Sequence, residues 1–250
     1  MKRSILVILI ICLAFPVSNA QLWKMKRWEA LGGIGPSFFF GDIGGFSRTK
    51  NILGLRDMSF MQTRFDINGN LKYRISRDVN LRLSLTYGMF HATDIRGSNE
   101  DRNFEASTSF FEPALIGEYY FIKNYAENSY LFLKQKQGFM KDLFKSLDFY
   151  AFAGFGGLSF KVIGNAGLEA SPGFTKSGFT AVIPAGLGTT LIFSPNLNFG
   201  LEVGGRYAFS DLLDGYTNSQ YSRSNDVYYF LNFTVTYKLK SGPHGLPSLR

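Results

Sequence analysis

The sequence predicts an all-β fold, an eight-stranded antiparallel transmembrane β-barrel with a short helical insert on its periplasmic side. Three observations lead to this class. Eight segments alternate apolar and polar side chains with the period of two that half-polar strands have. Long polar, glycine-bearing connections alternate with short turns along the chain. Phe and Tyr, at 26 and 13 residues, are unusually frequent, as expected for the aromatic girdles of a barrel in lipid.

The first 20 residues have the pattern of a Sec signal peptide and are set apart from the fold. Lys2 and Arg3 precede an apolar run over 5–15, and small residues at 18–20 form a cleavage site. This run is too short to cross a bilayer as a helix. Cys12, the only cysteine, lies in the same segment, so no disulfide is expected in the exported chain. We therefore expect export through the signal peptide and a location in the outer membrane.

The remainder of the chain suits one β-rich domain. We expect the barrel over 21–240, with 122–146 as a periplasmic insert, and a flexible tail over 241–250. Removing Lys2 and Arg3 from the formal net charge of +8 leaves +6. An exported chain is not expected to meet nucleic acid, so this charge favours contact with anionic lipid or an acidic partner.

The expected strands are short alternating segments bounded by polar connections. They are placed at 27–40, 64–75, 81–90, 111–121, 147–161, 177–193, 198–210 and 227–239. In 64–75, for example, Arg64 and Asp66 alternate with Phe65 and Ile67. A glycine cluster blurs the alternation in 147–161, which predicts a β-bulge there.

The charged face of these strands is expected to point into the barrel. Turning 64–75 over would expose Arg64, Lys72 and Arg74 to lipid, at about 2–4 kcal/mol for each cation at the midplane. An eight-stranded barrel is just wide enough inside for side chains, so the bulky apolar face is expected outside. Near-balanced charges predict an interior closed by ion pairs rather than a channel. These charges are Glu29, Asp66, Glu112, Glu118, Glu202, Arg64, Lys72, Arg74, Arg82, Arg206 and Lys238.

The connections predict the orientation. The tight turns at 76–80 and 194–198 are expected in the periplasm, and the long loops outside the cell. Those loops are 41–60, 93–105, 162–176 and 211–226. Aromatic residues on the lipid face then form two girdles. The periplasmic girdle holds Trp28, Tyr73, Tyr119, Phe121, Phe199 and Tyr237, and the outer girdle holds Phe38, Phe65, Tyr87, Phe179, Phe209 and Tyr229.

The connection over 122–146 is far longer than the two turns on its side of the barrel. Apolar residues at i, i+3, i+4 and i+7 predict an amphipathic helix, namely Met140, Leu143, Phe144 and Leu147. Lysines surround this stripe, among them Lys134, Lys136, Lys141 and Lys145. Two interpretations stay open. The helix caps the barrel mouth or lies on the inner leaflet, or it docks a periplasmic protein.

The sequence gives no catalytic constellation, so no enzyme activity is expected. His91 and Asp94 have the spacing of a general-base pair at the outer rim, but no placed nucleophile accompanies them. The acids of 41–45 and 211–215 are interpreted as turn formers, because they lack the ligand density of a calcium loop. No phosphate-binding glycine motif or zinc spacing is present. We expect no cofactor, no metal and no small-molecule substrate.

Three stretches share the features of one known family. They are "RWEALGGIGPSFFFGDIGG" (27–45), "RNFEASTSFFEPALIGEYYF" (102–121) and "IPAGLGTTLIFSPNLNFGLEVGGRYAFSDLLDGYT" (183–217). Together they resemble the PorG-like barrels of Bacteroidetes. The family pattern ends in a T-D-x-L-D-D loop, whereas this chain has Ser210 at its start and Gly215 at its end. The matched motif positions are Trp28, Glu29, Gly41, Asp42, Asp211 and Asp214, and the resemblance implies structural roles for them.

The resemblance also implies a role in type IX secretion, in contact with a periplasmic ring complex. The expected function is therefore a non-enzymatic outer-membrane anchor or adaptor, with outer-membrane lipid and periplasmic ring proteins as partners. One alternative is a small OmpA/OmpX-like barrel for adhesion or outer-membrane integrity. A second is a surface hydrolase centred on His91.

Overall fold

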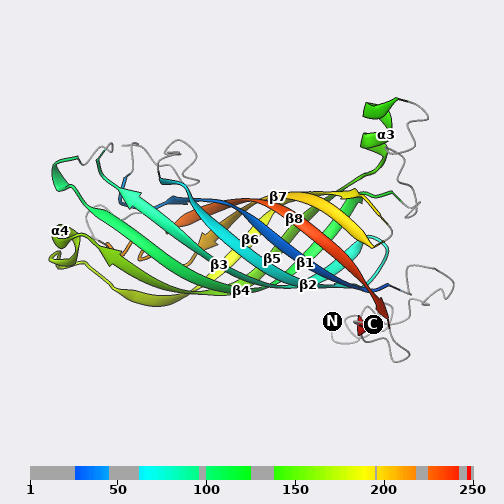
Figure 1. Cartoon of the computed structure of the whole chain (residues 1–250). Coiled ribbons are helices and arrows are strands. Elements are labelled where there is room, and N and C mark those ends of the chain that lie inside the picture. Colours follow the sequence, from blue (N-terminus) through cyan, green and yellow to red (C-terminus); the bar gives the residue numbers. More distant parts are fainter. Residues whose placement is uncertain are drawn as a thin grey trace, which may run out of the picture.

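The computed structural model contains a closed barrel and describes residues 26–44, 62–95, 100–124, 138–194, 196–217, 225–241 and 247–248 (Figure 1). The barrel strands are β1 (Trp28–Phe40), β2 (Arg64–Arg74), β3 (Val79–Thr93), β4 (Glu105–Ile122), β5 (Leu147–Gly164), β6 (Ser177–Ile192), β7 (Leu197–Ala208) and β8 (Val227–Ser241). Each strand pairs antiparallel with the next, and β1 also pairs with β8. The predicted eight-stranded antiparallel barrel is confirmed.

The two ends of the barrel differ in their connections. The end that we call the turn end holds the short β2–β3 and β6–β7 turns, the start of β1 and the end of β8. Helix α3 (Phe139–Lys145) belongs to the β4–β5 connection at this end (Figure 1). The opposite end, the loop end, carries the other four connections, each longer than the two short turns. They include the 3-10 turn η4 (Glu100–Arg102) and the short helix α4 (Ala166–Glu169).

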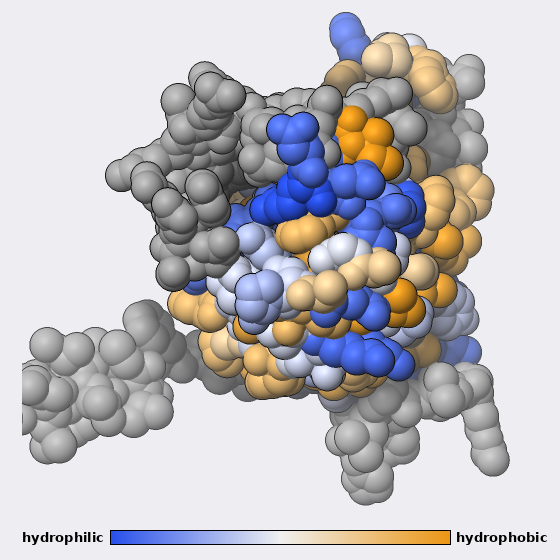
Figure 2. Space-filling view, turned by 90° about the vertical axis from the view of Figure 1, so that its left-hand side faces the viewer, coloured by the Kyte–Doolittle hydropathy of each residue, from blue (hydrophilic) through white to orange (hydrophobic). Residues whose placement is uncertain are grey.

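The outer wall is apolar and the inner wall polar, as the alternation predicts. Phe65 is 69% exposed, whereas its neighbour Asp66 is 2% exposed. The same contrast recurs around the barrel, with exposed Ile67, Leu83, Leu85, Leu115, Phe155, Leu187, Val203 and Phe233. In water this surface would be strongly unfavourable, so it is the surface of a transmembrane β-barrel. A view onto the loop end shows hydrophilic residues over the middle of this face and apolar residues along its margin (Figure 2).

The β-bulge predicted in the glycine cluster of 147–161 is not there. Strand β5 keeps its register with β4 from Ala114↔Gly156 to Gly117↔Ala153. The register shift lies instead in β4, between Tyr120 and Ile122. The prediction was wrong because glycines can pair regularly in a strand when they make room for neighbouring side chains.

Several strand ends also differ from the predicted ones. Strand β4 begins at Glu105 rather than at 111, and β3 continues to Thr93. Part of the predicted flexible tail forms β9 (Pro247–Ser248), which pairs with Lys240 and Ser241. The predicted signal peptide lies outside the described residues. Within the described ranges, no helix has the length and apolar character needed to cross a bilayer.

Candidate functional site

The interior of the turn half contains a network of ion pairs centred on Arg82. Its Nη1 lies 2.5 Å from Glu202 Oε1 and 3.2 Å from Glu118 Oε1. Lys72 Nζ lies 2.9 Å from the same Glu118 oxygen. Tyr150 donates its hydroxyl hydrogen to Glu202 Oε1 over 2.5 Å. Strands β2, β3, β4 and β7 therefore meet across the lumen through charged groups, and β5 joins them through the Tyr150 hydroxyl.

This network closes the lumen rather than lining a pore. The Arg82 and Lys72 side chains are 1% and 2% exposed, and that of Glu118 is fully buried. Buried charges of this kind are tolerated only when they are paired and hydrogen-bonded. The predicted ion-paired interior is confirmed for these groups.

A second pair lies closer to the mouth at the turn end. Arg74 Nη2 donates to Glu29 Oε1 over 2.9 Å, and both side chains are buried. Beside Glu29, Trp28 packs against Tyr73 at the rim, with ring centroids 4.9 Å apart. Two of the family-motif positions thus take part in an inward ion pair and a rim contact.

The interior of the loop half is filled by aromatic rings. Phe90 stacks on Phe110 with centroids 4.3 Å apart, and Phe110 on Phe230 at 5.9 Å. Tyr228 packs against Phe90 and donates its hydroxyl hydrogen to Glu112 Oε2 over 2.6 Å. The expectation that bulky side chains are excluded from the interior was therefore wrong for this half.

Inward glycines provide the space for these rings. A Cβ atom on Gly88 would lie 2.7 Å from Phe110 Cζ, and one on Gly178 would lie 2.7 Å from Phe160 Cζ. Such distances are well below a normal van der Waals contact. The sequence signal that we missed is an inward glycine on one strand beside an inward aromatic residue on the next.

Asp214 joins the two family-motif loops at the loop end. Its Oδ2 accepts from the backbone N–H groups of Asp42 at 2.8 Å and Ile43 at 3.0 Å, and its Oδ1 from Tyr216 N–H at 3.0 Å. A Cβ atom on Gly41 would come within 2.7 Å of the same carboxylate. The structure thus brings together Gly41, Asp42 and Asp214, which the resemblance had matched, whereas Asp211 lies nearby and half-buried.

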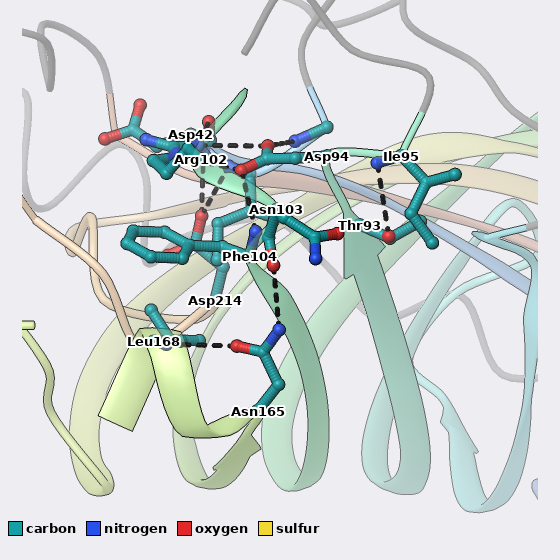
Figure 3. Close-up of polar contacts among 12 residues, drawn as sticks. Asp42, Thr93, Asp94, Ile95, Arg102, Asn103, Phe104, Asn165, Leu168 and Asp214 are labelled. Atoms are coloured by element: carbon teal, nitrogen blue, oxygen red, sulfur yellow. Dashed lines mark hydrogen bonds and ion pairs between the residues drawn. The ribbon is translucent and has the colours of Figure 1, made fainter. Parts of the chain in front are cut away.

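Arg102 links the β3–β4 loop to the β1–β2 loop (Figure 3). It donates from Nε and Nη2 to the Asp94 carboxylate over 2.7 and 3.0 Å, and from Nη2 to the Asp42 carbonyl over 3.0 Å. Its guanidinium also lies over the rings of Phe104 and Tyr216, at 4.9 and 4.8 Å. Sequence reasoning missed Arg102, although it begins the second stretch that resembles the PorG-like barrels.

The remaining loop joins this arrangement through Asn165. Asn165 donates from Nδ2 to the Asn103 carbonyl over 2.8 Å, and its Oδ1 caps α4 by accepting from Leu168 N–H over 3.0 Å (Figure 3). Further along the same loop, Thr175 N–H donates to the Gly215 carbonyl over 2.9 Å. The described parts of all four loops are therefore connected in a ring, which we call the loop ring.

Apolar residues seal the barrel under the loop ring. Ile43 and Leu213 are 3% and 0% exposed and belong to the same buried cluster as Phe39 and Phe90. Thr108, inside β4, donates to the Leu213 carbonyl over 2.6 Å. The loop end is thus held by polar bonds above and apolar packing below.

Two buried carboxyl groups of the loop end titrate far from their ordinary range. Burial raises the pKa of Asp214 to about 7, against the N–H bonds from Tyr216 and Ile43, and the nearby Asp42 adds to the rise. Burial and the adjacent Asp214 raise the pKa of Asp226 well above its usual value. Asp226 accepts from Leu213 N–H over 2.8 Å. Sequence reasoning missed Asp226, which directly precedes β8.

The candidate chemical sites are accounted for by structural roles. His91 Nδ1 lies 3.2 Å from Ser107 Oγ, and its Nε2 lies 3.7 Å from Glu105. Asp94 instead holds Arg102 and accepts from Gly44 N–H over 2.9 Å. The suspected His–Asp pair is therefore not formed. Among the described residues, no group of three or more His, Cys, Asp or Glu side chains is arranged to hold a metal ion.

The insert contains the expected helix, but its stripe is shorter than predicted. Helix α3 ends at Lys145, so Leu147 starts β5 instead of extending the helical face. Met140 and Phe144 are exposed, whereas Leu143 is half-buried. Lys141 and Lys145 are exposed on the helix, and Lys134 and Lys136 lie outside the described residues.

Comparison with known proteins reveals a likeness to several solved barrels. No family model matches the chain, and no curated protein matches its sequence. Neisserial surface protein A is similar at 12% identity and a TM-score of 0.43, covering 84% of this chain and 96% of that one. The N-terminal β-barrel domain of Pseudomonas aeruginosa OprF is similar at 14% identity and a TM-score of 0.40, covering 85% of this chain and 97% of that one. Ail, the attachment invasion locus protein of Yersinia pestis, is similar at 13% identity and a TM-score of 0.40, covering 85% of this chain and 99% of that one. In each comparison the likeness covers most of both chains.

Proposed function

We propose that the protein is a sealed, non-catalytic barrel of the bacterial outer membrane that supports the integrity of that membrane. The observation that carries this proposal is the filled interior. Ion pairs predominate in the turn half, aromatic rings predominate in the loop half, and the loop ring joins the described loops above them. The apolar outer wall supplies the lipid contact.

The orientation follows from the connections. Bacterial outer-membrane barrels have short periplasmic turns and longer extracellular loops. We therefore place the turn end in the periplasm and the loop end at the cell surface. In this orientation the loop ring lies at the outer end of the described part of a filled cylinder, which is suited to a barrier rather than to the passage of a solute.

Two measurements test this proposal. Purified protein in planar bilayers is expected to give no stepwise conductance. Cells that lack the protein are expected to become more sensitive to detergent and to large antibiotics, and the wild-type chain is expected to restore resistance. Lys161 is an exposed outward residue of β5. The variant Lys161→Met leaves the interior unchanged, so it is the control and should restore resistance as well. Stable ion conductance by the wild-type protein would contradict a sealed barrel.

The adaptor role in type IX secretion stays a prediction from the sequence. The feature that favours it is the helical insert at the turn end, on the side we assign to the periplasm. Its test is a replacement of 125–144 by a short glycine-serine linker, which keeps Asn124 and Lys145. Loss of secretion and of co-purifying periplasmic proteins, with the barrel still folded, would support the adaptor. Unchanged secretion would dispose of it.

A further inference from the structure

Helix α3 presents large apolar side chains to solvent. Phe139, Met140 and Phe144 are 53%, 59% and 61% exposed. The acid of this helix, Asp142, is 3% exposed and points toward protein. A helix of seven residues is too short to be stable in water by itself, because its stability depends on packing of one face. The apolar face of α3 therefore requires a surface that covers it.

The C-terminal end of α3 is fixed to the barrel rim. Asn124, two residues past β4, donates from Nδ2 to the Lys145 carbonyl over 2.8 Å and from its backbone N–H to Asp148 Oδ1 over 2.6 Å. Ile192, the last residue of β6, donates its N–H to the Ser146 carbonyl over 3.2 Å. At 1.5 Å per residue the helix extends only about 10 Å from this anchor. Its apolar face cannot move far from the rim.

The position of α3 relative to the barrel indicates what covers it. Figure 1 shows the helix to the side of the cylinder of strands and not across the mouth. This placement disagrees with a helix that caps the mouth. At the end of β4, where the insert begins, Tyr119, Phe121 and Ile122 are exposed on the outer wall. The apolar surface of the barrel therefore reaches the rim from which the insert emerges.

We propose that α3 lies in the membrane interface at the turn end, with Phe139, Met140 and Phe144 at the boundary between lipid headgroups and acyl chains. Interfacial helices bury their apolar face about 5–10 Å into this boundary, and the anchor at the rim keeps α3 close to it. Lys141 and Lys145, both exposed, are then placed to contact lipid phosphate groups. This inference rests on the proposed membrane location and adds a second lipid-binding element to it.

The test uses lipid quenching of a fluorophore attached to single cysteines in a Cys12→Ser chain. The full chain is folded into phosphatidylcholine vesicles with and without bromine on the acyl chains. Three positions are labelled separately: Met140→Cys on α3, Leu83→Cys on the outer wall and Glu169→Cys on α4 at the loop end. Leu83 is 50% exposed on the barrel wall, so it reports insertion of the barrel. Glu169 is exposed on a loop helix, so it reports a position in water.

Quenching at Met140→Cys of about twofold, close to that at Leu83→Cys and far above that at Glu169→Cys, is the expected result. Quenching at Leu83→Cys without quenching at Met140→Cys would overturn the inference and leave the membrane location standing; cysteine crosslinking from the same position in cells would then show whether a periplasmic protein covers α3. Absence of quenching at both positions would instead overturn the membrane location itself.

Discussion

Removal of Arg82 is the sharpest test of the ion-paired interior. The change Arg82→Met keeps much of the side-chain volume and removes the cation that contacts both Glu118 and Glu202. Breaking a buried pair by removing one partner costs about 3–5 kcal/mol, because a buried charge is left without its partner. Glu118 keeps Lys72 at 2.9 Å and Glu202 keeps the Tyr150 hydroxyl at 2.5 Å. We therefore expect a loss near the lower limit, about 3 kcal/mol.

The free energy of unfolding is measured by urea titration in phospholipid vesicles, with the mobility difference between folded and unfolded barrel in electrophoresis as the signal. Lys161→Met removes an exposed cation from the outer wall and is expected to stay within about 0.5 kcal/mol of the wild type. Adding Glu202→Gln to Arg82→Met neutralises the stranded carboxylate. The double variant should therefore be more stable than the sum of the two single losses by about 0.5–3 kcal/mol. Strict additivity, or an Arg82→Met barrel as stable as the wild type, would refute the buried network.

Three further changes probe the loop half, two by the same titration and one by amide exchange. Gly88→Ala forces a methyl group to within 2.7 Å of Phe110 Cζ and should cost about 1–3 kcal/mol, whereas Gly69→Ala, with no atom within 4 Å of the new Cβ, should have little effect. Asp214 has a folded-state pKa of about 7 against an ordinary value of 3.8, so its contribution to stability is present below pH 3.8 and is lost as the pH rises toward 7. The change Asp214→Asn should remove this part of the pH dependence between pH 4 and 7. An unchanged slope of stability against pH would contradict the assignment. Arg102→Lys loses the two-pronged contact with Asp94 and the stacking on Phe104, so amide exchange at Gly44 should accelerate by about tenfold or more, while protection within β3 should stay unchanged.

The barrel could be predicted from the sequence because the cost of exposing charged side chains to lipid outweighs other energetic differences between the two orientations of each strand. Period-two alternation defines two faces, and the charges of β2 forbid one of the two orientations in lipid. Strand ends were predicted less well. The first residues of β4, from Glu105 to Ser109, are mostly small and polar, so they show no apolar alternation, although they complete the pairing with β3. The composition of a short segment does not show that a neighbouring strand is available to pair with it.

The candidate site could be predicted only in part, because its contacts join residues far apart in sequence. Asp214 and Asp42 were matched through the family resemblance, but nothing in either loop indicates that one caps the other. Asp94 was paired with His91 because they are close in sequence, whereas the structure pairs it with Arg102, which returns from the far side of the same loop. The helical stripe was extended to Leu147 because an i+7 pattern does not show where a helix gives way to a strand.

The division of the interior into two halves explains why the loop ring can hold. Carboxylates that accept backbone N–H groups are strong partners only where water is kept away from them. Below Asp214, the side chains of Ile43, Leu213 and the aromatic rings fill the barrel and exclude water from the lumen side. In the turn half, Arg74 and Glu29 lie in the wall of a polar recess of about 20 Å³, room for little more than one water molecule. The interior directly below the loop ring is therefore the more apolar part. Shortening its aromatic rings, more than breaking the ion pairs, is what should loosen the loop ring.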